Sequence, residues 1–215
     1  MKVWLRALLL YGVLTVVLGV VYPLLVTGAA QLFWKEQANG SLVQRSGTLV
    51  GSERVGQNFA AGGYFWGRPS AGAYAGEVSG AANAFWSDTA YWETLRARGK
   101  ELRRRMGLAD SILLPADLVL TSASGLEPYI SVEAARLQAG RVAAARHWDR
   151  SRIEALIDRF TEPPQWNLLG TPRVNVIRLN LGLDSLALSD SSLIRTQAVV
   201  VPADPVADES RRRAP

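Results

Sequence analysis

The side chains that most often carry out chemistry in enzymes are scarce in this chain of 215 residues. It has no Cys and a single His, His147. A thiol nucleophile, a thiolate zinc site and an iron–sulfur cluster are therefore excluded, and so is a multi-histidine metal centre within one chain. His147 follows an Ala-rich segment that we expect to be helical, where a cation interacts favourably with the helix dipole. We interpret His147 as a helix-terminal residue and not as a general base.

Motifs that bind or transfer phosphate are also missing. A phosphate-binding loop needs Gly-Lys-Ser or Gly-Lys-Thr after a strand, but the Gly99-Lys100 pair is followed by Glu101. The chain contains neither Gly-x-Gly-x-x-Gly nor Asp-Lys-Thr-Gly, the string that carries the nucleophile of aspartyl-phosphate pumps. No pair of carboxylates has a spacing that suggests acid–base work. The sequence predicts a chain that is not an enzyme and holds no tightly bound cofactor or metal.

A long apolar segment occupies the amino-terminal part. From Ala7 to Trp34 there is no charged side chain, and about 20 apolar residues are enough to cross a bilayer as a helix. A cleaved signal peptide is the alternative, with Thr27-Gly28-Ala29 as the cleavage site. Its apolar core would exceed the roughly 7–15 residues usual for such signals. We therefore favour a retained membrane anchor over residues 1–35.

Four residues of the anchor are candidates for contacts with other membrane helices. Glycines leave surface on which a neighbouring helix can pack, and a proline kinks a helix. The four are Gly12, Gly19, Pro23 and Gly28. Lys2 and Arg6 favour a cytoplasmic amino terminus by the positive-inside rule. That orientation places residues 36–215 outside the cytoplasm.

Helical and strand patterns mix after the anchor, which predicts one extracytoplasmic α/β or α+β domain over residues 36–185. The expected strands lie within 41–55, 117–121 and 173–183. The expected helices are 89–106, one capped by Ser131 and running to Arg146, and one that starts with a capping box from Ser151 to Glu154. Loops rich in aromatic residues fill 56–92, and residues 186–215 are expected to be a disordered tail.

Two surface features have open interpretations. The net charge of +5 is concentrated in Arg96, Arg98, Lys100, Arg103, Arg104 and Arg105, opposed by Glu101 alone. At helical spacing such a run is most often a solvated face, and lipid headgroups, an acidic partner or nucleic acid are less favoured. Aromatic residues more often pack inside a domain than bind partners. The alternative is a docking patch made by Tyr64, Phe65, Trp66 and Arg68.

An ordered set of short strings is similar to one protein family. The string Tyr64-Phe65-Trp66-Gly67-Arg68-Pro69-Ser70-Ala71 resembles a signature of the C subunit (KdpC) of the bacterial high-affinity potassium-transporting Kdp ATPase. Further matching strings follow in the expected order: Pro115-Ala116-Asp117-Leu118-Val119, Thr121-Ser122-Ala123-Ser124-Gly125, and Leu169-Gly170-Thr171-Pro172-Arg173-Val174-Asn175-Val176. The resemblance covers about residues 5–185.

The resemblance implies a non-catalytic subunit of an ATP-driven potassium importer in the bacterial inner membrane. It implies two protein partners, a channel-like subunit that translocates potassium and a P-type ATPase subunit, together with membrane lipid and without nucleic acid.

The family is also described as a catalytic chaperone that raises the ATP affinity of the pump subunit, with a Gln that touches nucleotide. The matching position is Gln138, and ATP would be bound only through the complex. The predicted topology separates Gln138 from cytoplasmic ATP, so we interpret Gln138 as a solvated or hydrogen-bonding residue of a helix. The alternative function is a signal-anchored periplasmic binding module unrelated to potassium transport.

Overall fold

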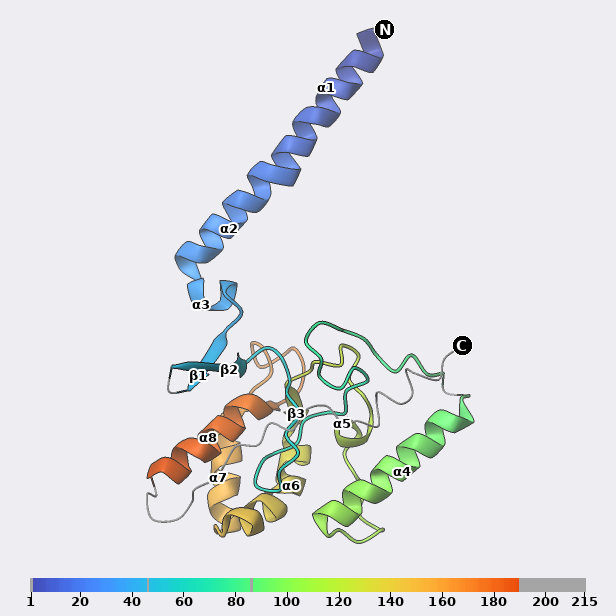
Figure 1. The fold of residues 1–215 in the computed structure, drawn as a ribbon, viewed down its shortest axis with the longest axis vertical. Coiled ribbons are helices and arrows are strands. Elements are labelled where there is room, and N and C mark those ends of the chain that lie inside the picture. Colours follow the sequence, from blue (N-terminus) through green and yellow to red (C-terminus); the bar gives the residue numbers. More distant parts are fainter. Residues whose placement is uncertain (1, 46, 86, 190–215) are drawn as a thin grey trace. The chain divides into compact units, whose positions relative to one another are not determined.

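The computed structural model describes residues 2–45, 47–85 and 87–189. Backbone contacts divide the chain into two compact units, Met1–Ser52 and Glu53–Pro215 (Figure 1). The first unit contains an apolar helix and a two-stranded sheet, and the second combines helices with a three-stranded sheet. The prediction of one amino-terminal apolar helix followed by mixed helix and strand is confirmed.

The first unit begins with an apolar rod. Its segments are α1 (Lys2–Val16), the π-helix η1 (Val17–Val21) and α2 (Tyr22–Phe33), and Figure 1 shows them as one continuous helix. From Lys2 to Phe33 the rod is long and apolar enough to cross a membrane. Its most apolar stretch of 18 residues has a mean hydropathy of 2.3, and none of that stretch is buried within this chain. A run of exposed apolar side chains of this length suits hydrocarbon and not water.

The π-helix lies immediately before Tyr22 and Pro23. The N–H of Tyr22 donates to the carbonyl of Val17, five residues earlier. In a regular α-helix the ring of Pro23 would collide with the carbonyl of Gly19, and Pro23 has no N–H to donate. Widening the preceding turn removes this conflict while the helix continues on both sides.

A short helix and a hairpin complete the first unit. They are α3 (Lys35–Ala38), β1 (Leu42–Arg45) and β2 (Thr48–Ser52), with the two strands antiparallel. Between α3 and β1, Gly40 and Ser41 have φ values of 87° and 47°. This left-handed backbone forms the turn, and the two strand pieces predicted within 41–55 are confirmed.

The second unit packs three helices around an antiparallel sheet whose strand order is β3-β5-β4. The strands are β3 (Tyr129–Ser131), β4 (Thr161–Glu162) and β5 (Arg173–Asn175), and the helices are α6 (Val132–Arg146), α7 (Arg150–Phe160) and α8 (Val176–Ser189). α7 buries Ile153, Leu156 and Ile157, which lie on one face of the helix at spacings of three and four residues. The hydroxyl of Ser131 accepts the N–H of Ala134 at 3.0 Å, so the predicted cap of α6 is confirmed.

The basic helix α4 (Thr89–Met106) has the predicted bounds. The carboxylate of Asp88 accepts the N–H groups of Ala90 and Tyr91, and Gly107 ends the helix in the left-handed region with a φ of 67°. The buried residues of α4 are Leu95 and Gly99. Most of its surface is therefore solvated.

Two strand predictions are wrong. Residues 117–119 belong to α5 (Ala116–Val119), a helical turn that Pro115 precedes at the N-cap position. Of residues 173–183 only Arg173–Asn175 are a strand. The side chain of Asn175 accepts the N–H of Arg178 at 3.1 Å and so starts α8.

The predicted capping box is also wrong. α7 begins one residue before Ser151, with Asp149 in the N-cap position. The carboxylate of Glu154 instead accepts from Arg150 at 2.7 Å. The predicted tail starts inside α8, which continues to Ser189, and residues 190–215 lie outside the described residues.

Candidate functional site

The segment with the family-like string lies in the core of the second unit. Tyr64, Phe65 and Trp66 are 5%, 0% and 8% exposed. Arg68 is half-buried and donates to the carbonyl of Thr121 at 3.3 Å. The three rings are therefore packing residues of this chain, the alternative that the sequence favoured over a docking patch.

Two buried amide side chains hold the backbone of this segment. Gln138 of α6 accepts the N–H of Trp66 at 2.8 Å and donates to its carbonyl at 3.1 Å. Asn180 of α8 accepts the N–H of Phe65 at 2.8 Å and donates to its carbonyl at 3.0 Å. Each amide replaces the neighbouring strand that would otherwise satisfy these buried groups. We call these two side chains, with the backbone of Phe65 and Trp66, the amide clamp.

Arg141 extends the clamp from the same face of α6. Its guanidinium donates to the side-chain oxygen of Gln138 at 2.8 Å and to the carbonyl of Tyr64 at 2.9 Å. It also stacks over the ring of Trp66, 3.6 Å from the centroid. Burial, followed by the nearby charge of Arg105, lowers the pKa of Arg141 to about 9. The side chain therefore remains a cation at neutral pH.

A buried ion pair contacts the residues that immediately precede the clamped segment. Arg146 of α6 and Asp184 of α8 are 3.0 Å apart, and their side chains are 3% and 10% exposed. Arg146 also donates to the carbonyl of Gly63 at 2.6 Å, and the hydroxyl of Tyr64 donates to Asp184 at 2.9 Å. Burial, followed by the charge of Asp184, raises the pKa of Tyr64, so its hydroxyl stays protonated.

The structure brings Gln138 and Tyr64–Trp66 together, although the sequence gave them separate roles. Gln138 is fully buried, its oxygen accepts two hydrogen bonds, and its nitrogen donates one. These contacts give Gln138 a structural role, because its amide links α6 to the backbone of Trp66.

The titratable groups do not cluster as metal ligands in the part of the chain that the structure describes. No group of three or more His, Asp or Glu side chains that could hold a metal ion is found there. His147 ends α6 with a φ of 54°, and its N–H donates to the carbonyl of Ala144. Its predicted helix-terminal position is confirmed.

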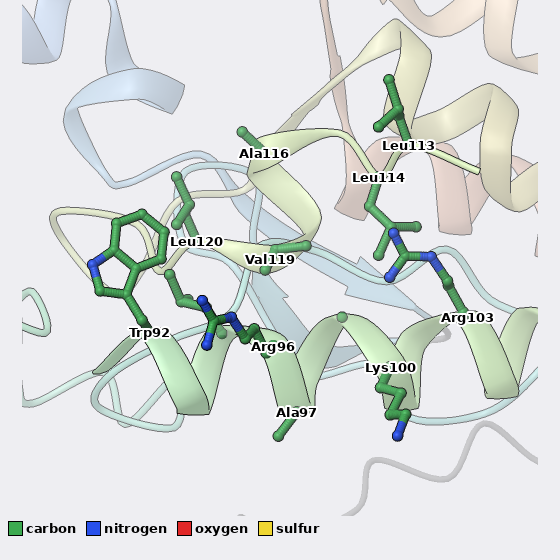
Figure 2. A pocket seen from close by; sticks show the side chains of 12 residues that line it. Trp92, Arg96, Ala97, Lys100, Arg103, Leu113, Leu114, Ala116, Val119 and Leu120 are labelled. Atoms are coloured by element: carbon green, nitrogen blue, oxygen red, sulfur yellow. The ribbon is translucent and has the colours of Figure 1, made fainter. Parts of the chain in front are cut away.

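The basic run lines one side of an open groove of about 1010 Å³ between α4 and residues 113–120. Figure 2 shows Arg96 and Arg103 on the side of α4 that faces Leu114, with Lys100 directed away. Arg103 donates to the carbonyl of Ile112, and Arg98 to that of Val119 at 2.7 Å.

Two further bases of the run are also engaged within the chain. Arg104 binds Glu101 at 2.6 Å, and Arg105 donates to the carbonyl of Ala60 at 3.2 Å. The run is therefore partly structural and partly solvated, with Arg96 and Lys100 exposed.

The four candidate residues of the anchor lie on the uncovered surface of the rod. A methyl group added at Gly12, Gly19 or Gly28 would meet no atom within 4 Å. Pro23 follows the π-helix. These positions are open to a second helix.

The sequence patterns did not single out the exposed turn between β4 and β5. Trp166 and Leu168 are 79% and 80% exposed. A signal was present, since the chain carries no charged residue between Glu162 and Arg173 but places a Trp and two Leu residues there.

Comparison with known proteins identifies relatives over most of the chain. The family model KdpC, described as "K+-transporting ATPase, c chain", matches residues 4–185. A potassium-transporting ATPase KdpC subunit from Dechloromonas aromatica is 44% identical over 191 residues, 87% of this chain and 100% of the relative. The KdpC subunit from Polaromonas naphthalenivorans is 46% identical over 84% of this chain and 93% of its own length. The one from Rhodospirillum rubrum is 47% identical over 83% and 93%.

Proposed function

This chain belongs to the KdpC family of potassium-transporting ATPase subunits, and from that premise we propose that it is the membrane-anchored, non-catalytic subunit of an ATP-driven potassium importer. The observation that carries the proposal is the match over residues 4–185, which spans both the apolar rod and the clamped second unit. The composition supports a role in assembly, because the chain has no Cys and one His.

In this proposal the rod Lys2–Phe33 crosses the inner membrane once with its amino terminus in the cytoplasm. The basic residues Lys2 and Arg6 support that orientation. The second unit is then extracytoplasmic. The partners are a channel-like subunit that carries potassium and a P-type ATPase subunit that hydrolyses ATP, with lipid around the rod.

The orientation can be tested without background labelling in this chain because it has no Cys. Leu113→Cys places a thiol at a side chain that is 86% exposed. We expect a membrane-impermeant maleimide to label it in spheroplasts. Lys2→Cys is the matched control and should react only after the membrane is permeabilised. The opposite pattern would reverse the topology.

The role in assembly is tested on the rod. We propose that another subunit's helix packs on the glycine surface, so Gly12→Leu or Gly19→Leu should reduce several-fold the ATPase subunits that co-purify with this chain from membranes. Gly12→Ala and Gly19→Ala are the size controls and should retain them. In limiting potassium, cells with the Ala variants should grow normally and cells with the Leu variants should grow poorly. Full recovery with the Leu variants would contradict this packing.

We further propose that any effect on the ATP affinity of the pump subunit passes through assembly and not through a contact between Gln138 and nucleotide. The burial of Gln138 and its bonds to Trp66 and Arg141 support this. Asn180 supplies a matched control because it holds Phe65 in the same way.

In the assembled complex, Gln138→Ala and Asn180→Ala should change the ATP concentration for half-maximal ATPase activity equally, or not at all. A shift confined to Gln138→Ala would favour direct nucleotide contact.

A further inference from the structure

The turn between β4 and β5 is a rigid hairpin. Gln165 and Leu169 form a bridge in which the N–H of Gln165 donates to the carbonyl of Leu169 at 2.9 Å. The N–H groups of Leu168 and Leu169 return to the carbonyl of Gln165 at 3.1 and 2.9 Å. The N–H of Asn167 donates to the carbonyl of Pro164 at 2.9 Å. We call residues 163–170 the apolar tip.

The backbone of the apolar tip is held in an unfavourable conformation. Trp166 and Asn167 have φ values of 53° and 57°. Asn tolerates this left-handed region, but a bulky residue such as Trp is uncommon there. Strained positions of this kind concentrate where a structure presents a side chain for function.

The side chains that the apolar tip presents are large and apolar. Trp166 and Leu168 are 79% and 80% exposed, and Leu169 is 52% exposed. Single exposed apolar residues are ordinary on proteins, whereas a Trp and a Leu together on one strained turn form a compact anchor. Trp is also enriched among the residues that dominate binding energy in protein interfaces.

The charges around the apolar tip indicate the chemistry of its partner. The neighbouring ion pairs set two acids against two bases. Glu162 lies 3.5 Å from Arg173 and 3.4 Å from Arg178, and Glu53 lies 2.8 Å from Arg178. From Pro163 to Pro172 there is no charged side chain. Elements that lie on membrane surfaces combine apolar residues with Lys and Arg, whereas the core of a protein interface is depleted in charge. A neutral tip therefore fits a protein pocket better than lipid headgroups.

We propose that Trp166 and Leu168 anchor this chain in an uncharged apolar pocket on another subunit of the potassium-transporting ATPase. The inference rests on the proposed function and deepens it, since it names the docking surface and the chemistry of its partner. The hairpin hydrogen bonds hold the backbone that carries the two side chains before binding, which lowers the ordering cost of docking. Because the contact is uncharged, its strength should be insensitive to salt.

A photocrosslinking experiment tests the contact directly in the full complex. Leu168 is replaced by photoreactive benzoylphenylalanine, and the complex is irradiated in membranes. We expect a crosslink to one other ATPase subunit. The same replacement at Leu113 is the control. Leu113 lies outside the apolar tip and is 86% exposed, and we expect no crosslink from position 113 to the surface that position 168 contacts. A crosslink from position 168 only to lipid or to a second copy of this chain would overturn the proposal.

A second measurement separates the two levels of the proposal. The purified complex, tagged on the ATPase subunit, is washed in 0.1 M and in 1 M salt, roughly the range over which exposed charges become screened. With the double variant Trp166→Ser/Leu168→Ser, the amount of this chain that stays bound to the tagged subunit should fall at least tenfold at both salt concentrations. With Leu113→Ser the amount that stays bound should not change.

If the unaltered chain does not co-purify, the proposed function fails. If the unaltered chain and the double variant are retained equally, only the docking surface is overturned.

Discussion

Two short segments of the second unit each present a tryptophan, and their surroundings are opposite. Trp66 is 8% exposed, and Gln138 and Arg141 surround its backbone and ring. Trp166 is 79% exposed on the apolar tip. In the first segment polar groups lie inside, and in the second apolar groups lie outside. Both arrangements are costly unless other groups compensate for them.

The difference shows where each segment finds its compensation. The amide clamp is completed by residues of its own chain, because α6 and α8 satisfy the backbone of Phe65 and Trp66 from two sides. The apolar tip forms its own hydrogen bonds but leaves its largest side chains in solvent. Changes in the clamp should therefore act on stability, and changes in the tip on association.

The largest effect is expected at the buried ion pair. Asp184→Ala leaves Arg146 charged and buried, so the free energy of unfolding should fall by about 3–5 kcal/mol. The double variant Arg146→Met/Asp184→Leu should recover part of this loss, because no charge then remains buried, although the Gly63 carbonyl and the Tyr64 hydroxyl lose their partners. Denaturant unfolding of the full-length chain in detergent, followed by fluorescence, measures both. Equal losses in the single and double variants would show that the loss of stability comes from altered packing and not from an unpaired buried charge.

A smaller loss is expected at the amide clamp. Gln138→Ala removes the partners of the N–H and carbonyl of Trp66. Each buried group left unsatisfied costs about 1–3 kcal/mol, which gives about 2–6 kcal/mol for the two groups. Because water can enter part of the space that Ala leaves, we expect the lower part of this range, about 2–4 kcal/mol, in the same unfolding assay. Asn180→Ala should give a similar value. A loss below about 0.5 kcal/mol in either variant would mean that water replaces the amide.

The pH dependence should reveal the buried phenol beside the clamp. Burial raises the pKa of Tyr74 from 10.0 to about 12, and its hydroxyl donates to the carbonyl of Arg68. Between these two pH values the unfolded chain releases the proton and the folded chain keeps it, so stability falls as pH rises. The lowered pKa of Arg141 acts in the opposite direction over the same range, because the folded chain loses that proton before the unfolded chain does. The contribution of Tyr74 is therefore measured as the difference in the free energy of unfolding between the unaltered chain and Tyr74→Phe, which should fall by on the order of 2 kcal/mol from pH 10 to pH 12.

The smallest effect on stability is expected at the apolar tip. Trp166→Ser removes a side chain that has little packing within the chain, so the free energy of unfolding should change by no more than about 0.5 kcal/mol. The control is Phe65→Ala, which empties a core position and should lower the free energy of unfolding by about 3–5 kcal/mol. The midpoints of denaturation of the two variants measure the difference. A large loss in Trp166→Ser would mean that the tip belongs to the fold, and the contrast between the two segments would disappear.

Local sequence signals predicted the elements whose causes are local. Ser131 caps α6 as predicted, and the helix predicted over residues 89–106 has those bounds in the structure. The strand predictions for 117–121 and 173–183 failed because β-branched and leucine residues suit both structures. What decides them are Pro115 and Asn175, which start helices in this context.

The amide clamp could not be read from spacing. Gln138 and Asn180 are far from residues 65 and 66 in sequence and meet them only through the packing of α6 and α8. The family resemblance marked Gln138 but implied a ligand for it. The apolar tip was readable in part, because an uncharged stretch with a Trp stands out, but its exposure depends on the left-handed turn.

The π-helix at Val17–Val21 changes how the faces of the anchor should be mapped. A residue in an α-helix advances about 100° around the axis, and a π-turn absorbs about one extra residue. On an uninterrupted helical wheel Gly12 and Gly28 would lie about 160° apart, on nearly opposite sides. With the extra residue taken out they are about 60° apart, within one flank of the cylinder. In a substitution scan along the anchor, the positions that are sensitive to substitution should therefore follow the usual helical period up to Val17 and continue with that period displaced by one residue after Val21.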